Sequence, residues 1–470
     1  MNPTVGTPLP LRLGISVVVA GLIVFTIAYA EKLGHRGQSA LGFLCFLGTA
    51  AAFSNNLQRV KLKTLFWGIL LQFSLAYAVL KFDDVRRVFE VVGEGIKTLI
   101  ACSDVGADFV FGSLSKPGGP SGFVFAFKAL PPIIFISSFF SVLYYLGVLQ
   151  LIVRFFAFLM RYVMGTSGAE TLSVSANVFM GQTEAPLIVK PFIPRMTKSE
   201  LLTLMASGMA HISGGMMAVY ISYGADPVSI LCTCIIACPC SLYLSKLVMP
   251  EIDTPETSDG ADIKVPRTHA NAIDAAAGGV KDGLFLAMNV AAMLIAFLAF
   301  IALFDAIIGS IWPEWSIQKI MGILFQPVAI LMGIEPSESE RVGSLLGIKL
   351  AANEHVAYVK FTKDAVLGMN PTMKLGMGAG MGVVGAAIQD TVCLSQRSQL
   401  LTVYALSGFA NFASIGIQLG GIGAMAEGRR SDLAKLGLKA LFVGYMVTLI
   451  NAAVAGMIME PKPVQYFFNP

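Results

Sequence analysis

The sequence has little charge. Only 13% of its 470 residues are Asp, Glu, Lys or Arg, with 33 basic and 29 acidic side chains, whereas a soluble domain carries about 25%. So few charges cannot cover the surface of a soluble protein of this length. Low charge together with 55% apolar residues also excludes a disordered chain. The net charge of +4 comes without a dense basic patch, which argues against a nucleic-acid partner. The sequence therefore predicts a multi-pass membrane protein.

Cysteine and histidine are also scarce, with seven and four residues. Seven cysteines in a chain of this length do not form a disulfide framework. Four of them lie close together, at Cys232, Cys234, Cys238 and Cys240. Because no His, Asp or Glu falls within this run, we interpret them as packing residues in an apolar segment rather than as a metal site.

Long apolar runs are abundant, and a membrane-spanning helix needs about 20 such residues. We expect nine spans, at Leu11–Ala30, Ala40–Phe53, Leu65–Leu80, Leu130–Ile152, Leu201–Tyr223, Pro227–Met249, Leu284–Ile311, Leu400–Gly423 and Leu438–Met457. The second and third are short and borrow flanking residues. Lys and Arg gather in the loops after the even-numbered spans, which predicts an amino terminus inside the cell.

The first span has a second interpretation. Ala28-Tyr29-Ala30 resembles a signal-peptidase site, so residues 1–30 are either a retained helix, which we favour, or a cleaved signal.

Two segments are too polar to face lipid. Thr171–Ile193 contains Asn177 and Glu184, and Val342–Lys360 contains Lys349 and Glu354. Broken segments of this kind are tolerated where they line a cavity, so each predicts a re-entrant hairpin. Each follows an apolar span and precedes two more, and counting the crossings makes the two hairpins enter the membrane from opposite sides.

The predicted fold class is therefore an all-α polytopic membrane protein of about nine transmembrane helices with two re-entrant helical hairpins in an inverted repeat, arranged as a scaffold and a transport domain. We expect N-terminal spans in 1–129, with Phe82–Ile100 as an interfacial helix or a polar loop. The first repeat is expected in 130–249, a cytoplasmic linker with an interfacial helix in 250–283, and the second repeat in 284–470.

The two acidic side chains in the hairpins are the strongest functional signals, because a charge inside the membrane is costly and usually functional. We expect Glu184 and Glu354 to face a common chamber. Gln182, Thr183 and Glu184 offer an amide, a hydroxyl and a carboxylate in succession. An amide matches the edge of a nucleobase or of another amide, and a carboxylate accepts from paired hydroxyls. The group suits a polar, neutral, hydroxyl-bearing solute.

Several motifs resemble the concentrative nucleoside transporter family. They are Gly181-Gln-Thr-Glu-Ala-Pro186, Asn271-Ala-Ile-Asp-Ala-Ala-Ala-Gly278, Asn289-Val-Ala-Ala-Met-Leu294, Asn353-Glu-His-Val-Ala-Tyr358 and Gly408-Phe-Ala-Asn-Phe412. The likeness runs from about Leu65 to Met457 with the motifs in the family's order. It implies a symporter rather than an enzyme, which takes up nucleosides as a homotrimer in the cytoplasmic (inner) membrane.

The resemblance also implies roles for individual residues. Gln182 and Thr183 would contact the base, and Glu184 would reach it directly or through water. Glu354, Asn411 and Ser414 would hold the ribose hydroxyls. Apolar walls would come from Phe409 and Leu294, with Met216 near the base. These residues do not specify a purine or a pyrimidine.

In the family a sodium ion lies near the first hairpin. It would be bound here by the Asn177 side chain and by backbone carbonyls near Met180 and Ile212. At the position of the family's Ser or Thr hydroxyl this chain has His211, whose imidazole is a poor sodium ligand but titrates near pH 6.5. Either a proton replaces sodium, or His211 turns away and hydrogen-bonds a carbonyl while Ser213 or water completes the ion site. We favour sodium.

Two further departures from the family pattern stand out. His355 replaces the usual Phe and either adjusts the polarity beside Glu354 or is a satisfied wall residue. The stretch 361–396 is longer than in relatives and contains a glycine-rich run at 376–382, which we interpret as a loop rather than a phosphate site.

Two other classes of function are alternatives. An intramembrane acid–base enzyme would use Glu184, Glu354 and His211, but no metal motif or nucleophile setting accompanies them. A passive channel would carry the same solute without accumulating it against a gradient.

Overall fold

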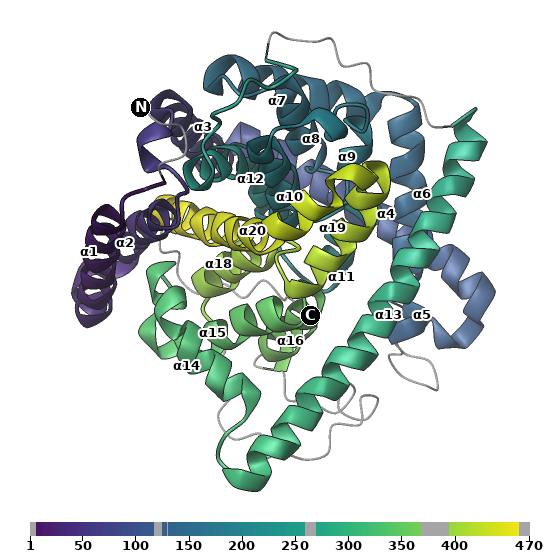
Figure 1. Cartoon of the computed structure of the whole chain (residues 1–470). Coiled ribbons are helices and arrows are strands. Elements are labelled where there is room, and N and C mark those ends of the chain that lie inside the picture. Colours follow the sequence, from purple (N-terminus) through teal and green to yellow (C-terminus); the bar gives the residue numbers. More distant parts are fainter. Residues whose placement is uncertain (1–5, 117–124, 129, 259–268, 368–393, 460–470) are drawn as a thin grey trace.

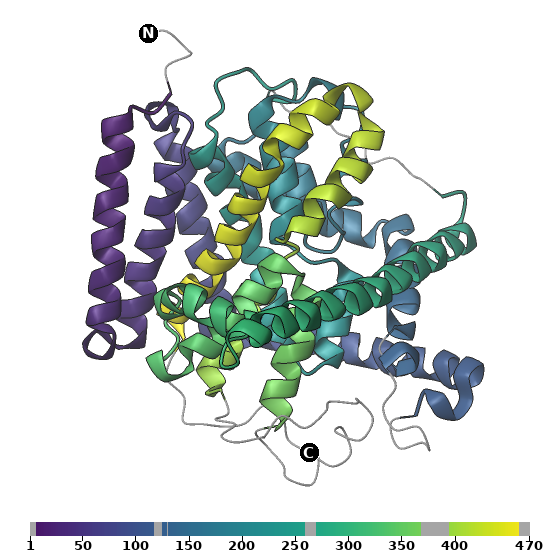
Figure 2. The same cartoon turned by 60° about the horizontal axis from the view of Figure 1, so that its bottom comes forward.

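The computed structural model describes residues 6–116, 125–128, 130–258, 269–367 and 394–459, and the regular elements in these ranges are helices (Figure 1). The N-terminal part comprises α1 Leu9–Ala28, α2 Ala30–Ala52, α3 Leu62–Lys81 and α4 Asp83–Phe111. Helices α1 and α2 stand side by side at one edge of the molecule (Figure 2). The stretch predicted as an interfacial helix or a loop is a helix, since α4 contains Phe82–Ile100 except for its first residue.

Two successions of helices follow in the same order. The first comprises α5 Phe125–Lys128, α6 Pro131–Tyr145, α7 Val148–Met164, α8 Gly168–Ala176, α9 Ala185–Ile188, α10 Lys198–Ala210, α11 Gly214–Ser222 and α12 Pro227–Val248. The second comprises α13 Ala272–Ile311, α14 Ile317–Leu331, α15 Pro336–Ala351, α16 Glu354–Leu367, α18 Gln396–Leu406, α19 Phe412–Met425 and α20 Arg430–Ile458. Short 3₁₀ turns lie at Leu57–Arg59, Gly112–Leu114, Ile193–Arg195 and Glu427–Arg429.

Both predicted hairpins are confirmed as broken segments. In the first, α8 ends at Ala176 and the chain turns through residues 177–184 before α9. In the second, α15 ends at Ala351 and α16 starts at Glu354. Ser167 begins the first hairpin with a capping box, because its side chain accepts from the Glu170 N–H and the Glu170 carboxylate accepts from the Ser167 N–H.

Seven of the nine predicted spans correspond to helices that are long and apolar enough to cross a membrane within the described residues, and the bent pair α14–α15 would make an eighth. The other two predicted spans, Ala40–Phe53 and Leu400–Gly423, are not among these helices. Leu400–Gly423 is not a continuous helix, because α18 ends at Leu406 and α19 starts only at Phe412. Two of the seven differ in detail: Leu201–Tyr223 is interrupted at residues 211–213, and the helix expected over Leu130–Ile152 ends at Tyr145, before the left-handed Gly147.

Helix α20 lies at the centre of the fold. It contacts α2, α3, α10, α12, α18 and α19, and most of its side chains are buried. Helix α13 is mostly exposed and runs along α6 at the side of the molecule (Figures 1 and 2). The four clustered cysteines are buried in α12, which is the position expected of packing residues.

Helix α2 packs against the end of α14 through a glycine. A Cβ at Gly42 would lie 1.7 Å from the carbonyl oxygen of Leu331, and a backbone atom cannot move aside as a side chain can. We expect Gly42→Ala to destabilise the protein by about 1–3 kcal/mol, although alanine favours a helix over glycine by about 1 kcal/mol. Thermal unfolding in detergent measures this change. Gly95→Ala in α4, where a Cβ meets nothing within 4 Å, is the matched control and should not lower stability. Equal stability of the two variants would contradict this packing.

Candidate functional site

The two interrupted helices meet at their breaks. The Phe409 N–H donates to the carbonyl oxygen of His211 at 3.2 Å, which joins the α18–α19 break to the α10–α11 break. Gly408 makes this approach possible, because a Cβ there would lie 3.0 Å from the carbonyl oxygen of Ala210. Ser213 and Asn411 then cap the helices that follow, α11 and α19. Backbone groups left unpaired by the helix ends therefore gather at the centre of the protein.

A chain of hydrogen bonds connects the two hairpins across this centre. The Gln182 amide donates to the Ser414 hydroxyl at 3.2 Å, the Ser414 N–H donates to Asn411 Oδ1 at 2.9 Å, and Asn411 Nδ2 donates to Glu354 Oε2 at 2.9 Å. All four residues are buried. The sequence prediction placed these residues in one site, and the structure brings them together.

The second carboxylate oxygen of Glu354 has a partner that sequence reasoning missed. The Tyr220 hydroxyl donates to Glu354 Oε1 at 3.2 Å. The Tyr220 ring stacks on Tyr358 with ring centroids 4.0 Å apart, and the Tyr358 hydroxyl lies 2.8 Å from that of Ser407. Tyr220 belongs to the first repeat and Glu354 to the second, so this contact also spans the two repeats.

Gln182 has a side-chain oxygen that is a buried acceptor without a donor in the described part of the chain. Its side chain is 7% exposed, and its Oε1 has no hydrogen-bond partner among the described residues. A buried acceptor without a partner costs free energy of about 1–3 kcal/mol. A ligand whose N–H group donates to Gln182 Oε1 would remove this cost.

Glu184 lies apart from this chain. Its Oε2 accepts from the Gly181 N–H at 3.0 Å, and it lines a cavity of about 140 Å³ together with Met180, Ser213 and Asp282. Glu354 does not line that cavity. The expectation that both acids face one chamber is therefore wrong for this conformation, because the local bond to Gly181 turns the Glu184 carboxylate back toward its own hairpin.

The other residues predicted to bind the substrate are Thr183, Met216, Phe409 and Leu294. The Thr183 methyl group faces Gly421 of α19, where a Cβ would lie 2.5 Å from it. Met216 is buried in the first turn of α11, and Phe409 packs against the core. Leu294 is buried in α13 but does not line the Glu184 cavity.

Next to the first hairpin, Asn177 and His211 converge on Ser207. Asn177 Nδ2 donates to the Ser207 hydroxyl at 2.9 Å, and His211 Nδ1 lies 2.7 Å from the Ser207 carbonyl oxygen. A carbonyl only accepts, so Nδ1 carries a proton, and His211 Nε2 faces Cys238 Sγ at 3.4 Å. The ring has partners at both nitrogens as a neutral imidazole, which is the arrangement expected if His211 turns away to bond a carbonyl.

Asn177 Oδ1 and Ser173 Oγ are buried without hydrogen-bond partners among the described residues. Both lie at the end of α8, where the Asn177 N–H donates to the Ser173 carbonyl. Oxygen atoms left unsatisfied beside a helix C-terminus form a donor set that suits a hard monovalent cation. Met180 and Ile212, the other predicted cation ligands, belong to the adjacent turn and to the α10–α11 break.

His355 contacts a tyrosine of the first repeat. The Tyr223 hydroxyl lies 3.2 Å from His355 Nε2, and the two rings pack edge to face. The two interpretations of His355, as a polar residue beside Glu354 or as a wall residue, both stay predictions. The glycine-rich run at 376–382 lies outside the described residues.

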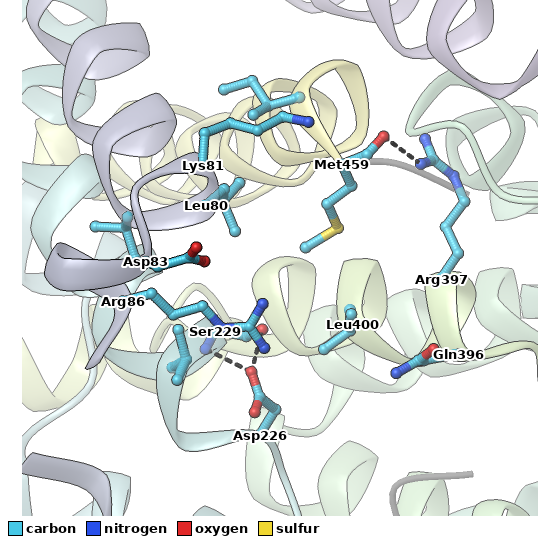
Figure 3. A pocket seen from close by; sticks show the side chains of 13 residues that line it. Leu80, Lys81, Asp83, Arg86, Asp226, Ser229, Gln396, Arg397, Leu400 and Met459 are labelled. Atoms are coloured by element: carbon cyan, nitrogen blue, oxygen red, sulfur yellow. Dashed lines mark hydrogen bonds between the residues drawn. The ribbon is translucent and has the colours of Figure 1, made fainter. Parts of the chain in front are cut away.

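A wider cavity of about 350 Å³ lies between the α3–α4 junction, the start of α12, the start of α18 and the end of α20 (Figure 3). Its charged side chains are Lys81, Asp83, Arg86, Asp226 and Arg397. None of the residues predicted to bind substrate or cation lines it. We therefore place the candidate site at the hairpins, although this cavity is larger.

Three family models match successive parts of the chain. Residues 41–114 match the N-terminus of the Na⁺-dependent nucleoside transporters, residues 126–227 match a nucleoside recognition (gate) domain, and residues 229–456 match the transporters' C-terminus.

Similar proteins of known sequence include an uncharacterized transporter of Haemophilus influenzae, 36% identical over 90% of this chain and 97% of its own length. Sodium/nucleoside cotransporter 1 of Homo sapiens is 38% identical over 94% of this chain and 67% of its own length. Among solved structures, CNTnw in an inward-facing substrate-bound state is 35% identical, with a TM-score of 0.81 over 90% of this chain and 98% of that one.

Proposed function

The chain belongs to the Na⁺-dependent, concentrative nucleoside transporter family, and from this premise we propose that it is a symporter that takes up nucleosides together with sodium. It is a transporter, not an enzyme, as are the relatives named sodium/nucleoside cotransporters. Its membrane is the bacterial inner membrane, and its assembly in the bilayer is a homotrimer with one transport path per subunit.

The observation that carries this proposal is the buried chain Gln182–Ser414–Asn411–Glu354. It has an amide at one end and a carboxylate at the other. A nucleoside carries groups that match both ends. Its base donates and accepts hydrogen bonds along one edge, as an amide does, and its two ribose hydroxyls donate to a carboxylate. The hydrogen bonds among these four residues hold their side chains in position. A bound nucleoside would take the place of these bonds.

Each side chain then has a role. Gln182 binds the base edge through its unpartnered Oε1, and Thr183 and Glu184 lie next to it on the same hairpin. Glu354, Asn411 and Ser414 bind the ribose hydroxyls. The apolar walls are Phe409, Met216 and Leu294.

Binding requires movement. Gln182, Ser414, Asn411 and Glu354 line neither the cavity beside Glu184 nor the wider cavity, and their side chains are buried and bonded to one another. A hairpin must therefore shift to admit a nucleoside, which is expected of a carrier with alternating access. Solved structures of CNTnw include inward-facing, intermediate and outward-facing states, which supports such motion in this family.

Sodium is the coupling ion that the donor set favours. Asn177 Oδ1 and Ser173 Oγ are unpartnered oxygens, and the carbonyls near Met180 and Ile212 complete the set. The proton alternative would need His211 to gain a charge, but its two nitrogens already have partners as a neutral ring. Coupling follows if sodium and nucleoside both favour the same conformation.

The test is uptake of labelled uridine or adenosine into sealed vesicles that contain the purified protein. We expect saturable uptake above the outside concentration, with the nucleoside recovered chemically unmodified. Modified product would favour an intramembrane enzyme, and uptake that stops at equal concentrations would favour a passive channel.

A further inference from the structure

Tyr220 contacts Glu354, but the proposed binding site gives it no role. Its hydroxyl donates to Glu354 Oε1 at 3.2 Å, its side chain is 0% exposed, and its ring is stacked on Tyr358. The phenol oxygen lies on the axis of the ring, so a ring flip leaves the oxygen in place. A buried, stacked ring therefore keeps its hydroxyl at Glu354 unless α11 itself moves.

The helix that bears Tyr220 also bears a residue of the proposed site. Met216 lies four residues before Tyr220 in α11, and residues four apart share one face of a helix. The rise between them is about 6 Å along the helix axis. Both side chains are buried. One face of α11 thus presents an apolar side chain where the base is expected and a phenol at the carboxylate that is expected to bind the ribose.

The Glu354 carboxylate can accept from the phenol and from both ribose hydroxyls. A carboxylate has two oxygens with about four acceptor sites in total. The bond from Asn411 to Oε2 belongs to the chain that a nucleoside would replace, whereas the bond from Tyr220 to Oε1 does not. While Tyr220 donates to it, Oε1 keeps one acceptor site. Each oxygen can then accept one of the two ribose hydroxyls while the phenol still holds the carboxylate.

We propose that Tyr220 is a positioning residue, which orients the Glu354 carboxylate toward the two ribose hydroxyls and so determines the preference for ribonucleosides over their deoxy forms. This inference rests on the proposed function. A carboxylate turns easily about the last bond of its side chain, and the phenol restricts this rotation. Without the phenol the carboxylate would still accept from one hydroxyl, but it would no longer be held for the pair.

Tyr220→Phe removes the hydroxyl and keeps the ring that stacks on Tyr358. We expect the dissociation constant for uridine or adenosine, measured by calorimetry in detergent at saturating sodium, to rise at least about tenfold, because the carboxylate loses a hydrogen bond of the charged kind. The maximal uptake rate in proteoliposomes should change less than about threefold. A higher KM at a similar maximal rate is expected of a residue that positions the binding group.

The 2′-deoxy and 3′-deoxy forms of the same nucleoside test the preference itself. Each should bind the unaltered protein more weakly than the parent nucleoside does. In Tyr220→Phe, at least one of these two losses of affinity should shrink at least about threefold, since the phenol and the ribose hydroxyl act through the same carboxylate. Groups that act through a shared partner give such a non-additive cycle, and independent groups do not.

The matched control is Tyr358→Phe. It removes another buried hydroxyl from the same pair of stacked rings, but this hydroxyl lies 2.8 Å from that of Ser407 and donates to the Val403 carbonyl oxygen at 3.2 Å. This variant should unfold at a lower temperature and should keep both losses of affinity for the deoxy forms.

Four results would overturn the inference: unchanged or tighter nucleoside binding by Tyr220→Phe; unchanged losses of affinity for both deoxy forms; the same shrinkage in Tyr358→Phe; or a Tyr220→Phe protein that does not fold, which would make Tyr220 a purely structural residue. The unaltered protein is measured in parallel. If it binds no nucleoside, the proposed function fails instead, so the two failures are distinguishable.

Discussion

Glu354→Gln is expected to reduce saturable nucleoside uptake at least about a hundredfold while leaving the protein folded. The carboxylate accepts from Asn411 at one oxygen and from Tyr220 at the other. An amide replaces one of these acceptors by a donor and removes the charge that strengthens bonds to ribose hydroxyls. Two hydrogen bonds to a charged group are worth about 3–6 kcal/mol, and each 1.4 kcal/mol is a tenfold change in affinity. Uptake into proteoliposomes and nucleoside binding in detergent measure the loss.

Glu338→Gln is the matched control for this prediction. Glu338 is also buried in the second hairpin, but its two oxygens accept from the backbone and hydroxyl of Ser395 at the start of α18. Its neutralisation should lower stability and spare uptake. Wild-type transport by Glu354→Gln, or an equal loss in both variants, would refute the assignment of Glu354 to the ribose.

Asn177→Leu is expected to abolish the effect of sodium on both stability and uptake. The substitution keeps the branched shape of the side chain and removes Oδ1, the buried oxygen without a partner at the end of α8, together with the Nδ2 donor to Ser207. A ligand that binds only the folded state stabilises it by about 2.7 kcal/mol at a hundred times its dissociation constant. The unaltered protein should therefore unfold at a higher temperature in sodium than in choline, and the variant should not.

The control is Asn451→Leu, a buried amide in α20 that contacts Gln72 and Thr233. It should retain the sodium-dependent shift even if its overall stability falls. A sodium shift that survives in Asn177→Leu would place the ion elsewhere.

The hairpins were predictable because polar residues interrupt otherwise apolar segments. Asn177 and Glu184 in one, and Lys349 and Glu354 in the other, cannot face lipid, so the sequence alone indicates sheltered, broken elements. The same reasoning could not find the break between α18 and α19. The sequence on both sides of it is apolar, and its cause is tertiary: Phe409 bonds to His211 across the two repeats.

The composition of the site was predictable in part. Gln182, Asn411, Ser414 and Glu354 were identified through their motifs, and they form one chain. The position of Glu184 was not, because a local bond to the Gly181 N–H decides where its carboxylate points.

One other contributor had no distinct signal in the sequence. Tyr220 is one aromatic residue in an apolar run, and its bond to Glu354 is formed only by the fold.

The most direct test of sodium-coupled nucleoside uptake imposes the two possible driving gradients separately on proteoliposomes that hold the unaltered protein. An inward sodium gradient at equal pH should accumulate labelled uridine or adenosine above its outside concentration. An inward proton gradient in choline should not. Accumulation driven by the pH gradient alone would contradict the account and would assign the coupling to His211.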